Sequence, residues 1–308
     1  MDMPSSSPRR AQFVVRDRCI NCGSAHLAVL DRGNFREGIV HDGMARSPHG
    51  EDPLPTLVDA EWVLQKCADC AQIFHRNVLD PEWMGIAYSQ WASVEAIEEF
   101  ERQHGLTAFA WRYRVALNRF KHVLRLERLT RPLRGDGPVR LIDFGCGKGE
   151  FVETCLAGEF EAYGVDFSTS RMDSARVKIV PTLDDAPGLF HVATLFEVLE
   201  HVERPAEILH MLSERLVPGG ILIVETPDCS GVTGIRSPRD KELVDPIQHI
   251  NGYTPATLTA IVERAGFSRI KRPMASAASG PIAIAKNVAA YLLGRGERST
   301  QQYFRKTA

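Results

Sequence analysis

The pattern of apolar and polar positions changes character near residue 136. Between residues 93 and 131, apolar side chains recur at roughly helical spacing, which predicts one or two helices divided near Gly105. From Val139 onward, short apolar runs alternate with amphipathic segments, which predicts strands separated by helices. The predicted strands are 139–144, 162–165, 178–183, 191–196 and 221–225, and the predicted helices between them are 151–156 and one that begins at Pro205. This alternation is typical of an α/β domain whose mostly parallel sheet is covered on both faces.

Helix signals also mark the later part of the chain. Residues 255–265 form the clearest predicted helix, because Thr254 can cap it, proline occupies its first position and Gly266 can end it. Ser168 is a suitable N-cap for a helix after the second strand. The last forty residues predict a helix over 284–293 and a final edge strand over 302–306.

Length and composition suggest one large domain with a small module attached. The chain has 308 residues, of which 44% are hydrophobic and 25% charged, as in ordinary globular proteins. We expect a disordered start over 1–12, a small module over 13–90, a helical linker or lid over 91–135 and the α/β domain over 136–308.

Charge and hydropathy limit the partners and the compartment that we expect. The net charge of -2 gives no global indication of nucleic-acid binding, and no eighteen-residue apolar stretch predicts a membrane span. The polar N-terminus lacks the apolar core of a signal peptide. We therefore expect a cytoplasmic protein without a membrane partner, and the overall charge does not favour a nucleic-acid partner.

A glycine-rich turn follows the first predicted strand of the α/β domain. In LIDFGCGKGEF, which begins at Leu141, glycines at 145, 147 and 149 allow a sharp bend and close approach to a ligand. A pyrophosphate-binding turn would need glycine at position 150, where this chain has glutamate, whose charge would repel a phosphate. The loop thus favours a ligand without phosphates and with a positive amino group near Asp143, although a turn without a ligand would look similar.

The second predicted strand ends in an acidic residue. Asp166 lies twenty-one residues after Gly145, where an acid can accept hydrogen bonds from both hydroxyls of a ribose. The alternative is that this aspartate only caps the following helix.

In these motifs the chain resembles the class I S-adenosylmethionine-dependent methyltransferases. Among them, it resembles the small-molecule enzymes that are similar to ubiquinone-biosynthesis O-methyltransferases. The resemblance rests on LIDFGCGKGEF, YGVDFS, LFEVLEHV, LVPGGILIVETP and QHINGYTPATLTAIVERAGF, in this order over about 139–270. It implies a Rossmann-like, doubly wound sheet that binds S-adenosylmethionine. The cofactor-binding residues that it implies are Asp143, Gly145, Cys146, Gly147, Asp166, Phe167, Asp184 and Phe196. Asp185 is the alternative to Asp184 near the adenine, and the third strand and its following loop are shorter here than in the family.

Acidic and histidine residues follow the fourth predicted strand. The spacing of Glu197, Glu200 and His201 places them on one side of a helical turn, and His249 could join them from across the cleft. The arrangement resembles the metal site of small-RNA 3′-terminal 2′-O-methyltransferases and the matching stretch of the ubiquinone-pathway enzymes. Three interpretations stay open: these four residues bind Mg²⁺ or another divalent ion, His201 or His249 acts as a general base near Glu197, or the residues are structural.

Two cysteine pairs characterise the N-terminal module. Cys19 and Cys22 form one C-x₂-C knuckle, Cys67 and Cys70 form a second, and four thiolates favour a closed, structural zinc site. A redox dithiol pair and an iron–sulfur cluster are the alternatives. The segment resembles the zinc-binding domain that precedes some sugar and natural-product methyltransferases, which implies a zinc-ribbon-like module.

Together these features predict a small-molecule methyltransferase with a structural zinc. We expect O-methylation of a biosynthetic intermediate, such as a hydroxyl of a sugar or natural product. Arginines over 112–134 leave open a metal-dependent RNA methyltransferase, although such a run is more often a solvated face. A non-catalytic regulator that binds the cofactor is the alternative outside the enzymes.

Overall fold

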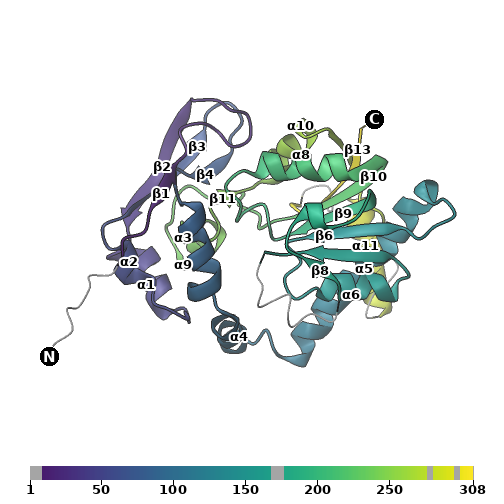
Figure 1. Ribbon diagram of the computed structural model, residues 1–308, viewed down its shortest axis with the longest axis horizontal. Helices are drawn as coiled ribbons and strands as arrows, with labels where there is room; N and C mark the ends of the chain where they lie inside the picture. Colours follow the sequence, from purple (N-terminus) through teal and green to yellow (C-terminus); the bar gives the residue numbers. More distant parts are fainter. Residues whose placement is uncertain (1–8, 168–176, 276–279, 295–298, 308) are drawn as a thin grey trace. The chain divides into compact units, whose positions relative to one another are not determined.

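The computed structural model describes residues 9–167, 177–275, 280–294 and 299–307 (Figure 1). The chain forms two compact units. The first comprises Met1–His104 together with Gly231–Gly252, and the second comprises Gly105–Ser230 together with Tyr253–Ala308. The predicted helix start at Ser168 lies outside the described residues.

A seven-stranded, mostly parallel sheet forms the centre of the second unit. Its strands, in spatial order, are β12 (Phe267–Ile270), β13 (Gln302–Lys306), β10 (Leu216–Glu225), β9 (Phe190–Phe196), β6 (Arg140–Phe144), β7 (Glu161–Val165) and β8 (Ile179–Val180). Only β13 runs antiparallel to its neighbours. The expected doubly wound α/β fold is confirmed.

The position of β13 differs from the prediction. The sequence places 302–306 at the sheet edge, but β13 pairs with β10 on one side and β12 on the other. Adjacent residues Tyr303 and Phe304 are 1% and 0% exposed, so both faces of this strand are covered. The edge strand is β12 instead.

Most of the described helices of the second unit begin where the sequence provides a cap or a proline. The described helices are α5 (Phe109–Thr130), η2 (Arg131–Leu133), α6 (Glu150–Ala157), η3 (Leu183–Asp185), α8 (Pro205–Arg215), α10 (Pro255–Arg264) and α11 (Pro281–Leu292). Thr254 and Thr257 form a reciprocal cap at the start of α10, and proline stands in the first turn of α8 and α10. The predicted strand 178–183 is shorter than expected, because β8 ends at Val180 and η3 follows.

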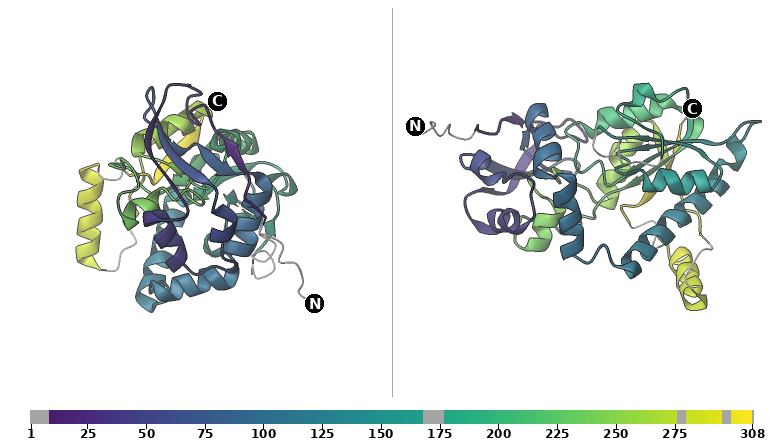
Figure 2. Two further views of the ribbon diagram at one scale, coloured as in Figure 1. Left: turned by 90° about the vertical axis from the view of Figure 1, so that its left-hand side faces the viewer. Right: turned by 60° about the horizontal axis from the view of Figure 1, so that its bottom comes forward.

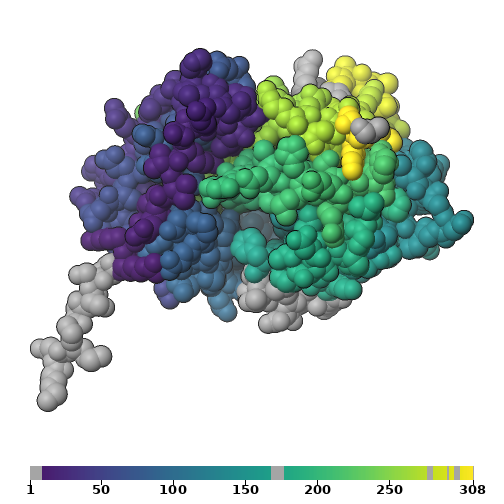
Figure 3. Space-filling model, turned by 45° about the horizontal axis from the view of Figure 1, so that its top comes forward, coloured from purple at the N-terminus to yellow at the C-terminus, as the bar shows by residue number. Residues whose placement is uncertain are grey.

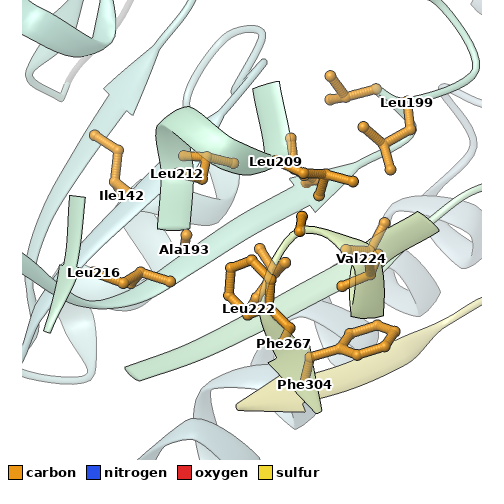
Figure 4. Close-up of a cluster of buried hydrophobic side chains, with 14 of the residues drawn as sticks. Ile142, Ala193, Leu199, Leu209, Leu212, Leu216, Leu222, Val224, Phe267 and Phe304 are labelled. Carbon is orange, nitrogen blue, oxygen red and sulfur yellow. The ribbon is translucent and has the colours of Figure 1, made fainter. Parts of the chain in front are cut away.

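Alternating side chains of β10 supply the two halves of the core. Leu222 and Val224 share one core cluster with side chains of α8 and α10, and Figure 4 shows them near Leu209 of α8. Ile221 and Ile223 pack with α5 and α6 on the other face. Side chains of neighbouring strand residues point to opposite faces, so a strand covered on both faces is apolar at every position. Each fully buried leucine or isoleucine stabilises the fold by roughly 1.5–3 kcal/mol. In Figure 3 the green and lime atoms of α8 and α10 form a continuous layer.

Helix α11 stands out from the rest of the second unit (Figure 2). Its Ile282 and Leu292 are 75% and 76% exposed. No helix among the described residues is long and apolar enough to span a membrane.

The first unit contains a small antiparallel sheet to which a later part of the chain contributes. The four-stranded sheet has the order β11 (Asn251–Gly252), β4 (Ile73–His75), β3 (Glu61–Cys67) and β2 (Leu27–Asn34), and β1 (Phe13–Val15) pairs with β5 (Asn77–Leu79). The helices are α1 (Gly38–Arg46), α2 (Leu54–Leu57), α3 (Pro81–Ile86), the π-helix η1 (Ala87–Trp91), α4 (Val94–Gln103) and α9 (Pro238–Leu243). Residues 231–252, which lie between β10 and α10 in sequence, thus belong to this unit through α9 and β11.

Candidate functional site

The glycine-rich turn joins β6 to α6 with a left-handed backbone. Gly145, Gly147 and Gly149 have φ of +73°, +57° and +76°, a region that favours glycine. A Cβ at Gly145 would lie 2.5 Å from Val198 Cγ2, whereas a Cβ at Gly147 would meet no atom of the described residues within 4 Å. Gly145 is therefore required by packing, and Gly147 borders open space that a ligand can use.

Two buried aspartates flank this turn at the carboxyl ends of β6 and β7. Asp166 Oδ2 accepts the Gly147 backbone N–H at 2.9 Å, and Asp143 Oδ1 accepts the Thr194 hydroxyl at 2.6 Å. Burial raises the pKa of Asp143 to about 7, and the Thr194 hydrogen bond opposes this shift. In open α/β sheets, ligands bind beyond these carboxyl ends.

The other predicted cofactor residues lie around the same edge. Asp184 is exposed in η3, and the neighbouring Asp185 is engaged in a capping box with Thr182. Phe167 is 65% exposed directly after β7. The Cys146 thiol packs against Gly164, where a Cβ would lie 2.4 Å from its Sγ.

Arg119 joins the turn from α5, which the sequence did not indicate. Its guanidinium forms an ion pair with Glu150 at the start of α6, and its charge favours the ionised form of Asp143. In the sequence, Arg119 is one of many arginines in a basic helix, so only the fold distinguishes it. It places a cation beside the turn.

Glu197 follows β9 in a strained conformation. Its φ of +55° is left-handed, which is uncommon for a residue other than glycine, and its backbone N–H donates to the Glu225 carbonyl at 2.9 Å. Such strain persists only where the surroundings hold it and is often found at functional sites. The adjacent Phe196 packs edge-on against His122 and Phe151.

Glu197, Glu200 and Glu225 form a group of neighbouring carboxyls, hereafter the carboxyl group cluster. Glu200 is buried and Glu225 is half-buried, whereas Glu197 is exposed as a whole residue although its carboxyl is partly shielded from solvent. Burial and the neighbouring Glu225 raise the pKa of Glu197 to about 7. Burial and Glu197 raise the pKa of Glu200 well above its usual range, and burial also raises that of Glu225. Three carboxyls this close do not all ionise together without a proton or a cation among them.

Glu200 and His201 lie in turns and not on the helical turn that the sequence predicts, because α8 begins only at Pro205. Glu200 is 1% exposed, and neither of its carboxylate oxygens has a hydrogen-bond donor among the described residues. His201 Nε2 lies 3.9 Å from Glu200 Oε1. His249 belongs to the first unit, where burial lowers its pKa.

Several polar side chains that the sequence did not indicate lie beside Glu225. Gln301 Nε2 donates to Glu225 Oε2 at 2.6 Å, and His122 Nε2 lies 3.8 Å from the same oxygen. His122 Nδ1 lies 2.7 Å from the Tyr303 hydroxyl. These residues come from α5, the end of β10 and the region of β13, so no local spacing could have indicated them.

The four cysteines of the N-terminal module converge. Cys19 Sγ lies 3.5 Å from Cys70 Sγ, Cys22 Sγ lies 3.6 Å from Cys67 Sγ, and all four sulfurs are within 4.8 Å of one another. A tetrahedral zinc with bonds of about 2.3 Å to sulfur needs sulfurs about 3.8 Å apart. The site therefore fits a four-thiolate metal centre.

Comparison with known proteins identifies the region around the glycine turn. A family model described as a methyltransferase domain matches residues 110–271, more than half of the 308 residues. The ubiquinone biosynthesis O-methyltransferase of Alkalilimnicola ehrlichii is 29% identical over 117 residues, which cover 33% of this chain and 47% of that protein. The enzyme of the same name from a Caulobacter species is 31% identical over 118 residues, with coverages of 33% and 47%. The chain thus spans about half the length of the curated relatives it matches.

Solved structures include proteins similar to this chain. The plantazolicin methyltransferase BpumL, in complex with a monoazolic desmethylPZN analog and SAH, is 13% identical with a TM-score of 0.47, and the match covers 73% of this chain and 94% of that one.

Proposed function

Because the chain belongs to the methyltransferase-domain family and is an S-adenosylmethionine-dependent methyltransferase, we propose that it methylates a hydroxyl of a small-molecule biosynthetic intermediate. The observation that carries the proposal is the carboxyl group cluster at the ends of β9 and β10, next to the cofactor turn. Methyl transfer to a hydroxyl requires removal of one proton, and a carboxyl with a pKa near neutrality suits that task.

The cofactor would lie across the carboxyl ends of β6, β7 and β9. Gly145, Cys146 and Gly147 would border its amino-acid portion, and Asp143 would hold the amino group. Arg119 supplies a cation for its carboxylate. The remaining contacts that we propose agree with the strand order: Asp166 and Phe167 would lie at the ribose, Asp184 near the adenine and Phe196 on the sulfonium side.

Two ways of activating the hydroxyl agree with this arrangement. In the first, Glu197 accepts the proton, with His201 or His249 as alternative bases; the raised pKa of Glu197 supports it. In the second, Glu197, Glu200 and His201 would hold a divalent ion such as Mg²⁺, which would lower the pKa of the hydroxyl, and His249 is the further ligand that the sequence suggests. The buried Glu200 carboxylate without a donor fits such a cation.

At the four cysteines we propose zinc in a structural role. Four thiolates leave no open coordination position, so this ion would stabilise the fold of the module and take no part in the chemistry. Metal analysis of the purified protein should find one zinc per chain, and replacing Cys67 with serine should abolish it. Iron with the absorption of an iron–sulfur cluster would refute the assignment.

The first experiment is calorimetric binding of S-adenosylhomocysteine to the wild-type protein and to Asp166→Ala. We expect micromolar binding to the wild type, its loss in Asp166→Ala, and normal binding to Asp136→Ala, an exposed control. Absence of binding to the folded wild type would refute the proposed cofactor site.

The second experiment identifies the acceptor class. Transfer of a radiolabelled methyl group is measured with matched phenols, sugars and amines, before and after treatment with a chelator of divalent ions. Turnover only with amines would refute O-methylation. Activity lost in chelator and restored by Mg²⁺ would support the metal, and activity unchanged by chelation would support Glu197 or a histidine as base.

RNA is a less suitable acceptor, because much of the basic helix α5 is already engaged within the second unit. Arg125 and Arg128 donate to the carbonyls of Pro273 and Met274, and Glu127 pairs with Arg131 at the start of η2. Salt-sensitive binding of RNA oligonucleotides would restore this alternative. Binding of the cofactor without turnover of any acceptor class would favour the regulator.

A further inference from the structure

The segment that contains His249 has little regular secondary structure. Residues 244–252, hereafter the His249 segment, end in β11, which has only the two residues Asn251 and Gly252. Within the segment, Asp245 Oδ1 accepts the backbone N–H groups of Ile247 and Gln248, and Lys241 Nζ lies 2.7 Å from Asp245 Oδ2. These bonds shape the turn before His249 but do not anchor the end of the segment.

The anchor comes from buried side chains of the N-terminal residues in the same unit. Arg16 Nη1 donates to Asn251 Oδ1 at 2.7 Å, and its Nη2 donates to the Ile250 carbonyl at 2.9 Å. The His75 backbone N–H donates to the same carbonyl at 2.9 Å, and His75 Nε2 lies 2.9 Å from the Val244 carbonyl. The segment is thus held at both of its ends.

A second anchor leads directly to the cysteines. Gln72 is 0% exposed, and its Nε2 donates to the Gly252 carbonyl at 2.8 Å. Its Oε1 accepts the side-chain amide of Asn21 at 3.2 Å. Asn21 lies inside the first cysteine knuckle, and its backbone N–H donates to Cys19 Sγ at 3.4 Å. The Gln72 carbonyl accepts the backbone N–H of Cys67 at 2.9 Å.

From this chain of contacts we propose that the four-cysteine site positions the His249 segment, with Gln72 as the positioning residue that connects them. A metal bound by the thiolates fixes both knuckles, and the knuckles fix the two amide groups of Asn21 and Gln72. Gln72 then sets the end of β11, three residues beyond His249. The importance of this connection for catalysis rests on the proposed role of His249. The connection between the four-cysteine site and the His249 segment is independent of that role.

The connection explains why a glutamine occupies a buried position. A buried amide is stable only when its hydrogen bonds are made, and Gln72 makes them with Asn21, with Ile73 and with Gly252. Methionine has nearly the same shape but neither donor nor acceptor of comparable strength. Gln72→Met therefore removes the connection while leaving the volume filled.

Hydrogen exchange of the full-length, zinc-loaded protein tests the proposal. Exchange is followed by mass spectrometry in peptides that cover 244–253, β2–β3 and β6. In Gln72→Met with one zinc per chain, we expect exchange in 244–253 to be about five- to tenfold faster, with β2–β3 and β6 unchanged. The matched control is Asn77→Leu, which removes an amide that donates to the Glu61 carbonyl in the same unit, and it should exchange like the wild type.

Metal removal provides the second arm. Stripping zinc from the wild type should accelerate exchange in 244–253 at least as much as Gln72→Met does, without affecting β6 in the second unit. Wild-type protection of 244–253 in the Gln72→Met protein, or in the metal-free protein, would overturn the proposal. S-adenosylhomocysteine binding is measured on the same samples, so a failure of the cofactor site is recorded separately from a failure of this connection.

Discussion

Replacing Gly145 with alanine tests whether packing or ligand approach dictates the glycines of the cofactor turn. An alanine Cβ there would lie 2.5 Å from Val198 Cγ2, inside normal contact distance. Val198 is 8% exposed and belongs to the core on the α8 side of the sheet, so it has little room to move. Gly147→Ala is the matched control, because φ is also positive there but, in the part of the chain that the structure describes, no atom lies within 4 Å of the added Cβ.

The expected magnitudes follow from two separate costs. A left-handed backbone costs alanine about 1 kcal/mol relative to glycine, and this applies to both variants. Overpacking adds about 1–3 kcal/mol, and only Gly145→Ala incurs it. Alanine also reduces the conformational entropy of the unfolded chain relative to glycine, which stabilises both variants by the same ~0.4–1 kcal/mol. The free energy of unfolding should therefore fall about 1–3 kcal/mol further in Gly145→Ala than in Gly147→Ala.

Urea unfolding followed by circular dichroism measures this difference, and calorimetry with S-adenosylhomocysteine complements it. Gly147→Ala should remain nearly as stable as the wild type yet bind the ligand weakly, because its methyl group occupies the space proposed for the cofactor. Equal losses of stability in the two variants would refute the packing argument. Wild-type affinity in Gly147→Ala would refute the proposed position of the ligand.

Three further outcomes follow from the charges around the site. Because burial raises the pKa of Asp143 to about 7, the affinity for S-adenosylhomocysteine should fall below pH 7 by up to about tenfold per pH unit; a flat calorimetric profile from pH 5.5 to 8 would contradict this. Arg119→Ala should weaken the same binding about tenfold, whereas Arg128→Ala, which loses only a bond to a backbone carbonyl, should bind normally. Burial lowers the pKa of His122 to about 3, so the unfolded chain takes up a proton that the folded chain refuses, and stability present above pH 6.5 is lost as the pH falls toward 3. His122→Phe should flatten the decline of unfolding free energy between pH 6 and 4 by up to ~1.4 kcal/mol per pH unit, and an unchanged slope would show that His122 is not buried in its neutral form.

The α/β sheet could be predicted because its signals are local. Strands covered on both faces appear as apolar runs, as in 221–225, and proline and threonine mark the starts of α8 and α10. The inner position of β13 was not predicted, since a short strand near the end of a chain looks like an edge. The consecutive aromatics Tyr303 and Phe304 are the signal that could have corrected it, because an edge strand seldom buries both faces.

The N-terminal unit shows where such local reading fails. The cysteine knuckles have a spacing that can be read directly, and their sulfurs do converge. The sequence did not predict that residues 231–252 belong to the same unit. The strand β11 has only two residues, and its hydrogen-bond partners Arg16 and Gln72 are far away in sequence. A strand this short has no periodicity, and side-chain hydrogen bonds from distant residues decide its position.

The same contrast explains why the cofactor end of the site is easier to predict than the acceptor end. The proposed cofactor contacts come from two strand–loop segments, so Gly145 and Asp166 stand at a fixed distance along the chain. The acceptor end that we propose lies at the ends of β9 and β10 and beside α5, where His122 and Gln301 contact Glu225. These residues share no motif, because any acceptor requires its own set of contacts while the methyl donor stays the same. Variation in substrate should therefore be sought around Glu225 and His122, and constancy of the donor around the glycine turn.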